Sequence, residues 1–173
     1  DTANAEALVI RLNTPGGSVD LTRQIIQQII SSDVPVVVYV WPRGGFAASA
    51  GTFITLAAHV AAMAPNTSIG AASPIDSNGG DIDETLRAKI ENILVADIKN
   101  LANRRGKEAI DWAQQAITQA KAATAQEALE LGVIDFVAND LDDLLRQMDG
   151  FVVDVNGEEV TLHTANAPTR TIE

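Results

Sequence analysis

The sequence predicts one α/β domain built from repeated strand–helix units, with an additional long helix. Its 173 residues are enough for one domain with a substantial core but few for two. Hydrophobic residues make up 46% of the chain and aromatic residues only 4%, so the core must consist of Ala, Ile, Leu and Val. Short apolar runs alternate with amphipathic helical patterns, which is typical of a parallel sheet covered by helices.

The first strand–helix–strand unit lies at the start of the chain. Residues 7–12 (ALVIRL) form a short apolar run that predicts a buried strand. Residues 18–32 predict an amphipathic helix, which carries these apolar residues on one side: Val19, Ile25, Ile26, Ile29 and Ile30. Residues 35–41 (PVVVYVW) are almost continuously apolar, as expected for a strand that is covered on both faces.

The middle of the chain combines short elements with one long helix. After a Gly/Pro break, residues 47–59 predict a helix, and short strands are expected near 60–64 and 68–72. The polar stretch 73–83 contains two adjacent glycines and is the best candidate for a mobile loop. A helix is predicted from Glu84 to Asn103, and its apolar face consists of Leu86, Ile90, Ile93, Leu94, Ile98 and Leu101.

The last third of the chain continues the alternation and ends in a hairpin. A helix is predicted at 109–119, and a capping box of Thr124 with Glu127 begins another helix, which Gly132 ends. The remaining elements are a strand at 133–138, a helix at 140–148, a hairpin at 152–162 around Asn156-Gly157, and a linker-like tail at 163–173.

Composition and charge exclude several classes of function. The formal net charge is −11, which argues against nucleic-acid binding because phosphates require clustered Lys and Arg. The chain has no cysteine, and His59 and His163 stand apart from other ligand residues, so no metal site is expected. No apolar run is long enough to span a membrane, and no signal peptide is visible. Because the chain starts at Asp1, close to its first strand, we expect it to be a piece of a longer protein.

The turn from Thr14 to Ser18 (TPGGS) is the first candidate site. Its glycines, Gly16 and Gly17, let backbone N–H groups point outward with no side chain in the way, so the turn can bind an anion or an oxyanion. The alternative is an ordinary tight turn between a strand and a helix. The phosphate-binding patterns of dinucleotide-binding proteins and P-loops are not matched.

Ser49 is the second candidate because it is the lone hydroxyl among small residues in GGFAASAG. It lies near the start of a predicted helix, where unpaired N–H groups and the positive end of the helix dipole favour a developing negative charge. Its neighbours Ala48, Ala50 and Gly51 leave room for a substrate. The alternative is a small residue at a packed helix start.

A serine nucleophile needs a base, and the sequence offers few. His59 follows Ser49 by nearly three helical turns and cannot touch it, and His163 lies in the tail. Lys89 lies near the edge of the apolar face of the long helix, whereas Lys99 points away from it. A desolvated lysine amine loses its proton readily and can then accept the proton of a serine. The alternative for Lys89 is a boundary residue whose amine extends into solvent.

Four segments, in this order, resemble the ClpP-class serine proteases: LNTPGGS, GGFAASAGTFI, MAPNTSIGAASPI and EALELGVIDFVANDLDDLL. Within this class the chain is most similar to the protease domain of NfeD-type membrane-bound proteases, also called stomatin operon partner proteins. That domain ends in a pattern like LLRQMDG here, before a hairpin and membrane helices. The resemblance implies a ClpP/crotonase-like fold, with a protease domain at 1–150 and the hairpin and linker at 151–173.

The resemblance also implies a catalytic pair. Ser49 matches the nucleophile of the family's A-S-A-G or A-S-M-G motif. In ClpP the base is a histidine shortly after a P-N-S stretch, but Ala72 stands at that place here, so a Ser-His-Asp triad is not supported. NfeD-type proteases, like signal peptide peptidase A, use a serine–lysine dyad, and Lys89 in AKIENI matches their lysine.

An oxyanion hole follows from the same resemblance. Gly17, together with Gly16, matches the glycines of the family's P-G-G motif, and the backbone N–H of Ala50 is the second donor. No metal, nucleotide or other cofactor is implied. The family normally has a further strand and helix before the strand at 7–12, and these are missing from this sequence.

The resemblance implies a serine endopeptidase that cleaves apolar segments of peptides or membrane-associated proteins. It implies a homo-oligomer, a dimer or larger, a stomatin-like membrane protein as partner, and a soluble, extracytoplasmic domain of a membrane-anchored protein. Two alternatives stay open. One is a catalytically silent scaffold or binding domain of a membrane complex. The other is a crotonase-type acyl-CoA enzyme, which the acidic chain and the pair of Ser49 and Lys89 oppose.

Overall fold

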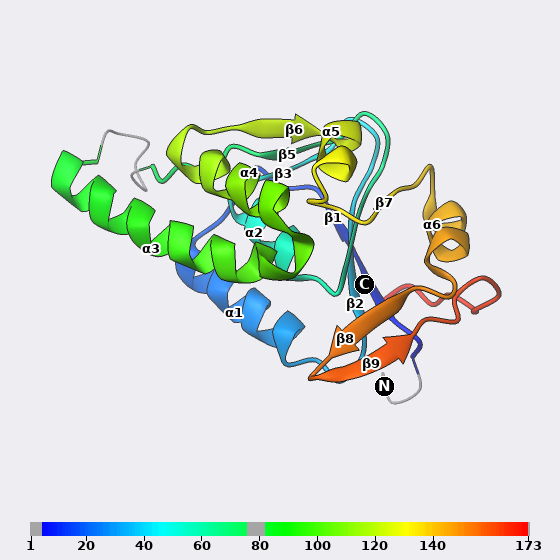
Figure 1. Cartoon of the computed structure of the whole chain (residues 1–173). Coiled ribbons are helices and arrows are strands. Elements are labelled where there is room, and N and C mark those ends of the chain that lie inside the picture. The colour runs from blue at the N-terminus through cyan, green and yellow to red at the C-terminus, as the bar shows by residue number, and fades with distance from the viewer. Residues whose placement is uncertain (1–4, 76–81, 173) are drawn as a thin grey trace.

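The computed structural model describes residues 5–75 and 82–172 and has a parallel sheet at its centre (Figure 1). Its strands pair in the order β1-β2-β4-β7, and every pair is parallel. They are β1 (Leu8–Leu12), β2 (Val36–Val40), β4 (Val60–Met63) and β7 (Phe136–Val137). The predicted α/β class is confirmed. β7 is shorter than the strand expected at 133–138, because only two of those residues pair with β4.

The helices connect the strands and cover the sheet. They are α1 (Val19–Ile30), α2 (Ala50–Ala57), α3 (Glu84–Ala102), α4 (Lys107–Thr118), α5 (Ala125–Glu130) and α6 (Leu141–Met148), with a 3-10 turn at Asn103–Arg105. Each predicted helix is present with boundaries shifted by a few residues, and the capping box of Thr124 and Glu127 is formed. Of the loop predicted at 73–83, residues 76–81 lie outside the described residues.

A second, smaller sheet lies across one end of the first (Figure 1). It contains β3 (Phe46–Ala48), β5 (Ser68–Gly70) and β6 (Ala122–Thr124) in the order β3-β5-β6, with β6 antiparallel to β5. The sequence predicts β5 but not the other two strands, and residues 47–48 of β3 lie in the helix predicted at 47–59. Such short, alanine-rich strands have weak intrinsic preference for a strand, and partners distant in sequence stabilise them.

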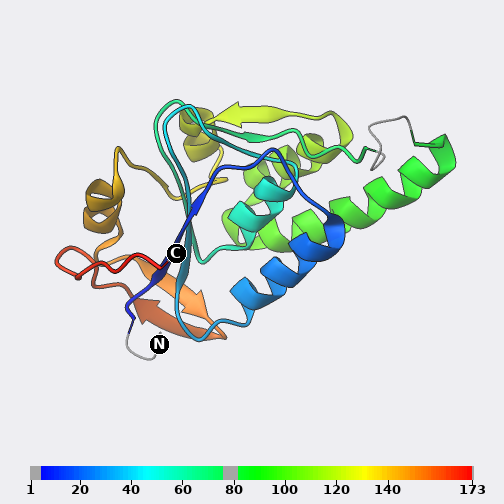
Figure 2. The ribbon, with the colours of Figure 1, turned by 180° about the vertical axis from the view of Figure 1, so that it is seen from behind.

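The two central strands of the main sheet, β2 and β4, are buried on both faces (Figures 1 and 2). The strand expected at 7–12 is present as β1, but it lies at the edge of the sheet and is only partly buried, so the expectation of a buried strand there is wrong. Along β2, Val38 packs towards α1 and α2, whereas Val37 and Tyr39 pack towards α6 and the hairpin. That hairpin consists of β8 (Val152–Val155) and β9 (Glu158–Thr161), as predicted. This two-sided burial explains why β2 is apolar at every position.

Two predicted apolar faces are only partly covered. On α1, Ile26 and Ile29 pack inward, but the other predicted residues, Val19, Ile25 and Ile30, are exposed. On α3 the C-terminal half is packed, with Ile98 fully buried, whereas Leu86 and Ile93 are 51% and 54% exposed. The reason is geometric, because the first turns of α3 project beyond the body of the molecule (Figure 1).

His59 holds the end of α2 against β2 and is 8% exposed. Its Nδ1 accepts a hydrogen bond of 3.0 Å from the Val36 N–H, and the Arg104 guanidinium donates to the carbonyls of Ala58 and His59. Burial, and then the charge of Arg104, lower the pKa of His59, while Asp154 partly offsets them. His59 follows the C-terminal end of α2, whereas Ser49 precedes its N-terminal end, so His59 is separated from Ser49 by the whole helix, as predicted.

Acid should destabilise the fold through His59. The unfolded chain takes up a proton on this ring near pH 6.5, whereas the folded chain resists it, so the free energy of unfolding should fall as the pH drops below that value. The variant His59→Asn keeps an acceptor for Val36 but does not titrate. Urea unfolding at pH 7.5 and 5.5 should show a smaller loss in His59→Asn than in the unaltered chain, and equal losses would contradict the assignment.

Candidate active site

Ser49 occupies a strained turn between β3 and α2. Its backbone angles are φ 52° and ψ −115°, a left-handed conformation that non-glycine residues rarely adopt. Its N–H donates to the Gly70 carbonyl at 3.0 Å, which holds the turn in place. The side chain makes no capping bond to α2, and no described residue pairs with its hydroxyl. A sharp strand-to-helix turn of this kind presents a serine oxygen to a substrate.

Thr52 supports this turn from the buried side, a role that the sequence did not predict. Its side chain is fully buried, and its Oγ1 lies 3.1 Å from the carbonyl oxygens of Ala47 and Gly70. The same oxygen accepts from the Gly70 N–H at 3.1 Å. Thr52 therefore joins β3, β5 and α2 beneath Ser49. The available signal was a hydroxyl residue in the otherwise apolar first turns of a buried helix.

The Thr14–Ser18 turn packs directly against Ser49. The Thr14 N–H donates to the Phe46 carbonyl, and the Ala48 N–H donates to Thr14, so the turn continues the pairing of β3. At Gly16, φ is +138°, and a Cβ atom would lie 3.0 Å from the Ser49 Cβ and 3.4 Å from its Oγ. Glycine is therefore required at this position for the turn to approach the serine.

Two of the three predicted oxyanion donors are available. The Gly16 N–H already donates to the Thr14 hydroxyl at 3.2 Å. The Gly17 N–H has no acceptor among the described residues, and Gly17 lines the same cavity as Ser49. Ala50 begins α2, so its N–H has no acceptor within the helix and lies at the positive end of the helix dipole. Gly17 and Ala50 thus have N–H groups without an acceptor among the described residues, and their role as oxyanion donors stays a prediction.

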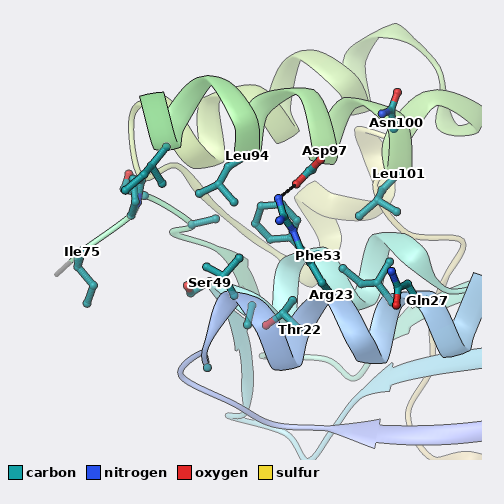
Figure 3. Close-up of a pocket in the computed structure, with 18 of the residues that line it drawn as sticks. Thr22, Arg23, Gln27, Ser49, Phe53, Ile75, Leu94, Asp97, Asn100 and Leu101 are labelled. Carbon is teal, nitrogen blue, oxygen red and sulfur yellow. Dashed lines mark hydrogen bonds and ion pairs between the residues drawn. The ribbon is translucent and has the colours of Figure 1, made fainter. Parts of the chain in front are cut away.

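Ser49 opens into a cavity of about 460 Å³ between α1 and α3 (Figure 3). Apolar side chains form most of its lining: Val19, Ile26, Phe53, Ile75, Ile82, Ile90, Leu94 and Leu101. Arg23 of α1 and Asp97 of α3 form an ion pair of 2.8 Å in the same cavity. Ala72 also lines it, and no histidine is among the described residues of the lining. A cavity of this size and lining fits an apolar part of a ligand.

Lys89 lies outside the cavity of Ser49 in the single chain. It is exposed on α3 and does not line the cavity, and Lys99 on the same helix is also exposed. Of the two interpretations of Lys89, the single chain shows the boundary residue whose side chain is exposed to solvent. The reason is that Lys89 lies on the projecting part of α3, where no described element covers it. Its catalytic role stays a prediction.

The described residues contain neither a metal-ligand cluster nor a membrane-spanning helix. Over 5–75 and 82–172, no three His, Cys, Asp or Glu side chains come together as metal ligands. Over the same ranges, no helix has the length and apolar character required to cross a bilayer.

Comparison with known proteins identifies the family. The family described as "NfeD1b, N-terminal domain" matches residues 1–156. The chain belongs to this family. A membrane-bound protease of Pyrococcus horikoshii is 45% identical over 172 residues, which cover 96% of this chain and 38% of that protein. The chain thus spans well under half the length of this NfeD-type relative.

Solved structures agree with the family assignment. A membrane-bound stomatin-specific protease matches in two mutant forms. Its lysine-to-alanine mutant with a substrate peptide has a TM-score of 0.89 and 42% identity, covering 98% of this chain and 78% of that one. Its serine-to-alanine mutant has a TM-score of 0.90 and 43% identity, covering 98% and 83%. ClpP1 from Listeria monocytogenes, at 22% identity and TM-score 0.61 over 80% of this chain and 76% of its own, shows that the NfeD1b domain has the ClpP fold.

Removing the Thr52 hydroxyl should loosen the Ser49 turn. We expect Thr52→Val to lower the free energy of unfolding by about 1–3 kcal/mol, because the buried Gly70 N–H loses its acceptor. Thr52→Ser keeps the hydroxyl and should lose less. Urea unfolding of both variants measures the difference, and a greater loss in Thr52→Ser would show that the methyl group, not the hydroxyl, matters at this position.

Proposed function

We propose that this chain is the catalytic domain of a serine protease with a serine–lysine dyad. One observation carries the proposal. The Ser49 hydroxyl has no partner among the described residues, sits on a strained turn at the positive end of α2, and opens into an apolar cavity. Membership of the NfeD1b family and similarity to a membrane-bound protease support it.

In the proposed reaction the Ser49 oxygen attacks the carbonyl carbon of a peptide bond. The N–H groups of Gly17 and Ala50 donate to the oxygen that becomes negative. Lys89, as a neutral amine, accepts the serine proton and delivers it to the leaving amine. An acyl-enzyme forms on Ser49, and water then releases the acid and restores the hydroxyl.

The assignment of Lys89 rests on the relative as well as on this sequence. The stomatin-specific protease was solved with a serine replaced by alanine and with a lysine replaced by alanine, the latter with a substrate peptide. The separation of those two residues along that chain matches that of Ser49 and Lys89 to within one position. Lys89 thus fits the dyad by position, although its amine must approach Ser49 when the active form assembles.

The relatives suggest the substrate class and the setting. We propose that the substrate is an apolar segment of a membrane-associated protein, which the apolar cavity fits. The solved relative is named as specific for stomatin, so a stomatin-like membrane protein is the proposed partner. The relative in Pyrococcus is membrane-bound, and we propose that this domain belongs to a membrane-anchored protein and faces away from the cytoplasm.

A second copy of the chain is the proposed cover for the projecting part of α3. Leu86 and Ile93 are both more than half exposed there and lie on the same helix as Lys89. Packing by another copy would bury these side chains and desolvate nearby groups, which favours a neutral amine. Such an arrangement would make the homo-oligomer the active form.

Charges on this surface should dissociate the proposed oligomer. We expect Leu86→Glu and Ile93→Glu to shift the sedimentation coefficient to that of the single chain, because a carboxylate cannot be buried in an apolar contact without a partner. Ile172→Glu, at an exposed residue of the tail, is the control and should have no effect. A single-chain coefficient already in the unaltered protein would contradict the oligomer.

Two other functions are alternatives to a serine–lysine protease. The exposed amine of Lys89 is the observation that favours a catalytically silent binding domain. Catalytic contacts are often loose in unliganded enzymes, however, so exposure in a single chain does not decide against catalysis. A crotonase-type acyl-CoA enzyme is not favoured, because the matched family and the similar proteins are of the NfeD and ClpP type.

Hydrolysis of apolar peptides tests the dyad. Ser49→Ala should reduce cleavage to background, and Lys89→Ala should lower kcat by about 10²–10⁴-fold, since a general base contributes that much. Initial rates at pH 7.5, with circular dichroism to verify folding, provide the measurement.

Lys99→Ala is the matched control, since Lys99 is an exposed lysine of the same helix, and it should keep full activity. Cleavage that persists in Ser49→Ala would contradict the assignment of a serine protease. Folded protein that cleaves no peptide would leave the silent binding domain as the better interpretation.

A further inference from the structure

The cavity beside Ser49 contains an ion pair that the proposed chemistry does not use. Arg23 Nη2 of α1 and Asp97 Oδ2 of α3 lie 2.8 Å apart and connect the two helices that form the walls (Figure 3). They are the only charged side chains among the described residues that line this cavity. The rest of the lining is mainly apolar, with a few neutral polar groups.

Stability does not explain the pair. The side chains of Arg23 and Asp97 are 51% and 42% exposed, and ion pairs so accessible to water contribute little to folding. The location of the ion pair suggests a function for it, because both charged groups face the cavity into which Ser49 opens. Any side chain that fills this space meets the two charges together.

The cavity is large enough to hold a substrate side chain beside the ion pair. Its volume of about 460 Å³ is roughly three times that of an engineered cavity that holds benzene. In a peptide attacked by Ser49, the residue that supplies the reacting carbonyl lies next to the serine, so its side chain is the one closest to this space. A long side chain in that position extends towards the pair.

We propose that the Arg23–Asp97 pair determines which substrate side chain the cavity accepts. The two opposite charges compensate each other, so the cavity carries no net charge. Each charge is already paired, so a basic or acidic side chain of a substrate would lose its hydration without gaining a counter-charge. An apolar side chain has no such loss and is selected. This inference rests on the proposed function, in that the cavity receives a substrate side chain beside Ser49.

Breaking the pair should therefore change the preference in a direction set by the remaining charge. In Arg23→Leu, Asp97 is unpaired and should favour a basic side chain. In Asp97→Leu, Arg23 is unpaired and should favour an acidic one. The double exchange, Arg23→Asp with Asp97→Arg, restores a pair with its charges reversed and should restore the preference for an apolar side chain.

Binding measured in a Ser49→Ala background tests this without requiring catalysis. The probes are three acetylated tetrapeptides with a free carboxylate, Ac-Ala-Ala-Ala-Leu and the same peptide ending in Lys or Glu, titrated by NMR. Their last residue corresponds to the one that carries the reacting carbonyl. We expect the Kd for the Lys peptide, relative to the Leu peptide, to fall about tenfold or more in Arg23→Leu, the range of effect that single pocket contacts have. The Glu peptide should gain similarly in Asp97→Leu.

Arg87→Leu is the matched control, because it removes the ion pair of Arg87 with Glu91 on α3, which does not line the cavity. It should leave the order of the three peptides unchanged. If the double exchange does not fold, Arg23→Leu with Asp97→Leu replaces it and should bind the Leu peptide most tightly. An unchanged order in both single variants, or no binding of any peptide to the unaltered cavity, would overturn the inference.

Cleavage by the chain with Ser49 intact is measured separately, so the two proposals can fail separately. If the preferences change as expected but no peptide is cleaved, the protease proposal fails and the role of the pair stands. If peptides are cleaved but the single variants keep the original preference, the role of the pair fails alone.

Discussion

The close approach of β6 to Gly70 is the constraint on which the candidate site depends. A Cβ atom at Gly70 would lie 2.3 Å from the Lys121 carbonyl oxygen, so only glycine allows β5 and β6 to pair at this point. The Gly70 carbonyl in turn accepts a hydrogen bond from the Ser49 N–H, and the Gly70 N–H donates one to the Thr52 hydroxyl. The strained turn at Ser49 is thus held by a small sheet whose packing has no space for a side chain. Such rigid surroundings are what allow a strained residue to persist.

The main sheet supplies the rest of the geometry. Its parallel strands all end on the same side, which brings the turn after β1 next to β3 and Ser49. Ligands of open α/β sheets commonly bind beyond the carboxyl ends of the strands. Here the central strands β2 and β4 are buried on both faces, and β1 pairs with β2 along its whole length. This pairing fixes the position from which the Gly16–Gly17 turn begins.

The cavity is less tightly packed than the small sheet that holds Ser49. Its walls, α1 and α3, are joined there by an accessible ion pair, and the outer turns of α3 have no cover in the single chain. A rigid nucleophile beside a less constrained binding wall suits an enzyme that must hold a reacting carbonyl closely and accept varied apolar segments. The lack of cover on the outer turns of α3 also explains why Lys89, on that part of the helix but outside the cavity, is exposed to solvent.

The sequence by itself determined the elements and much of the candidate chemistry. Apolar periodicity located the helices and the central strands, and local motifs located Ser49 and the Gly16–Gly17 turn, because these signals depend on neighbours within a few residues. Only the tertiary structure decided the rest. Strands β3 and β6, the support from Thr52, the joining of Arg23 to Asp97 and the exposure of Lys89 all depend on contacts between residues distant in the chain. Periodicity also marks which face of a helix is apolar, but not whether another element covers it, which is why Leu86 and Ile93 were expected to be buried and are exposed.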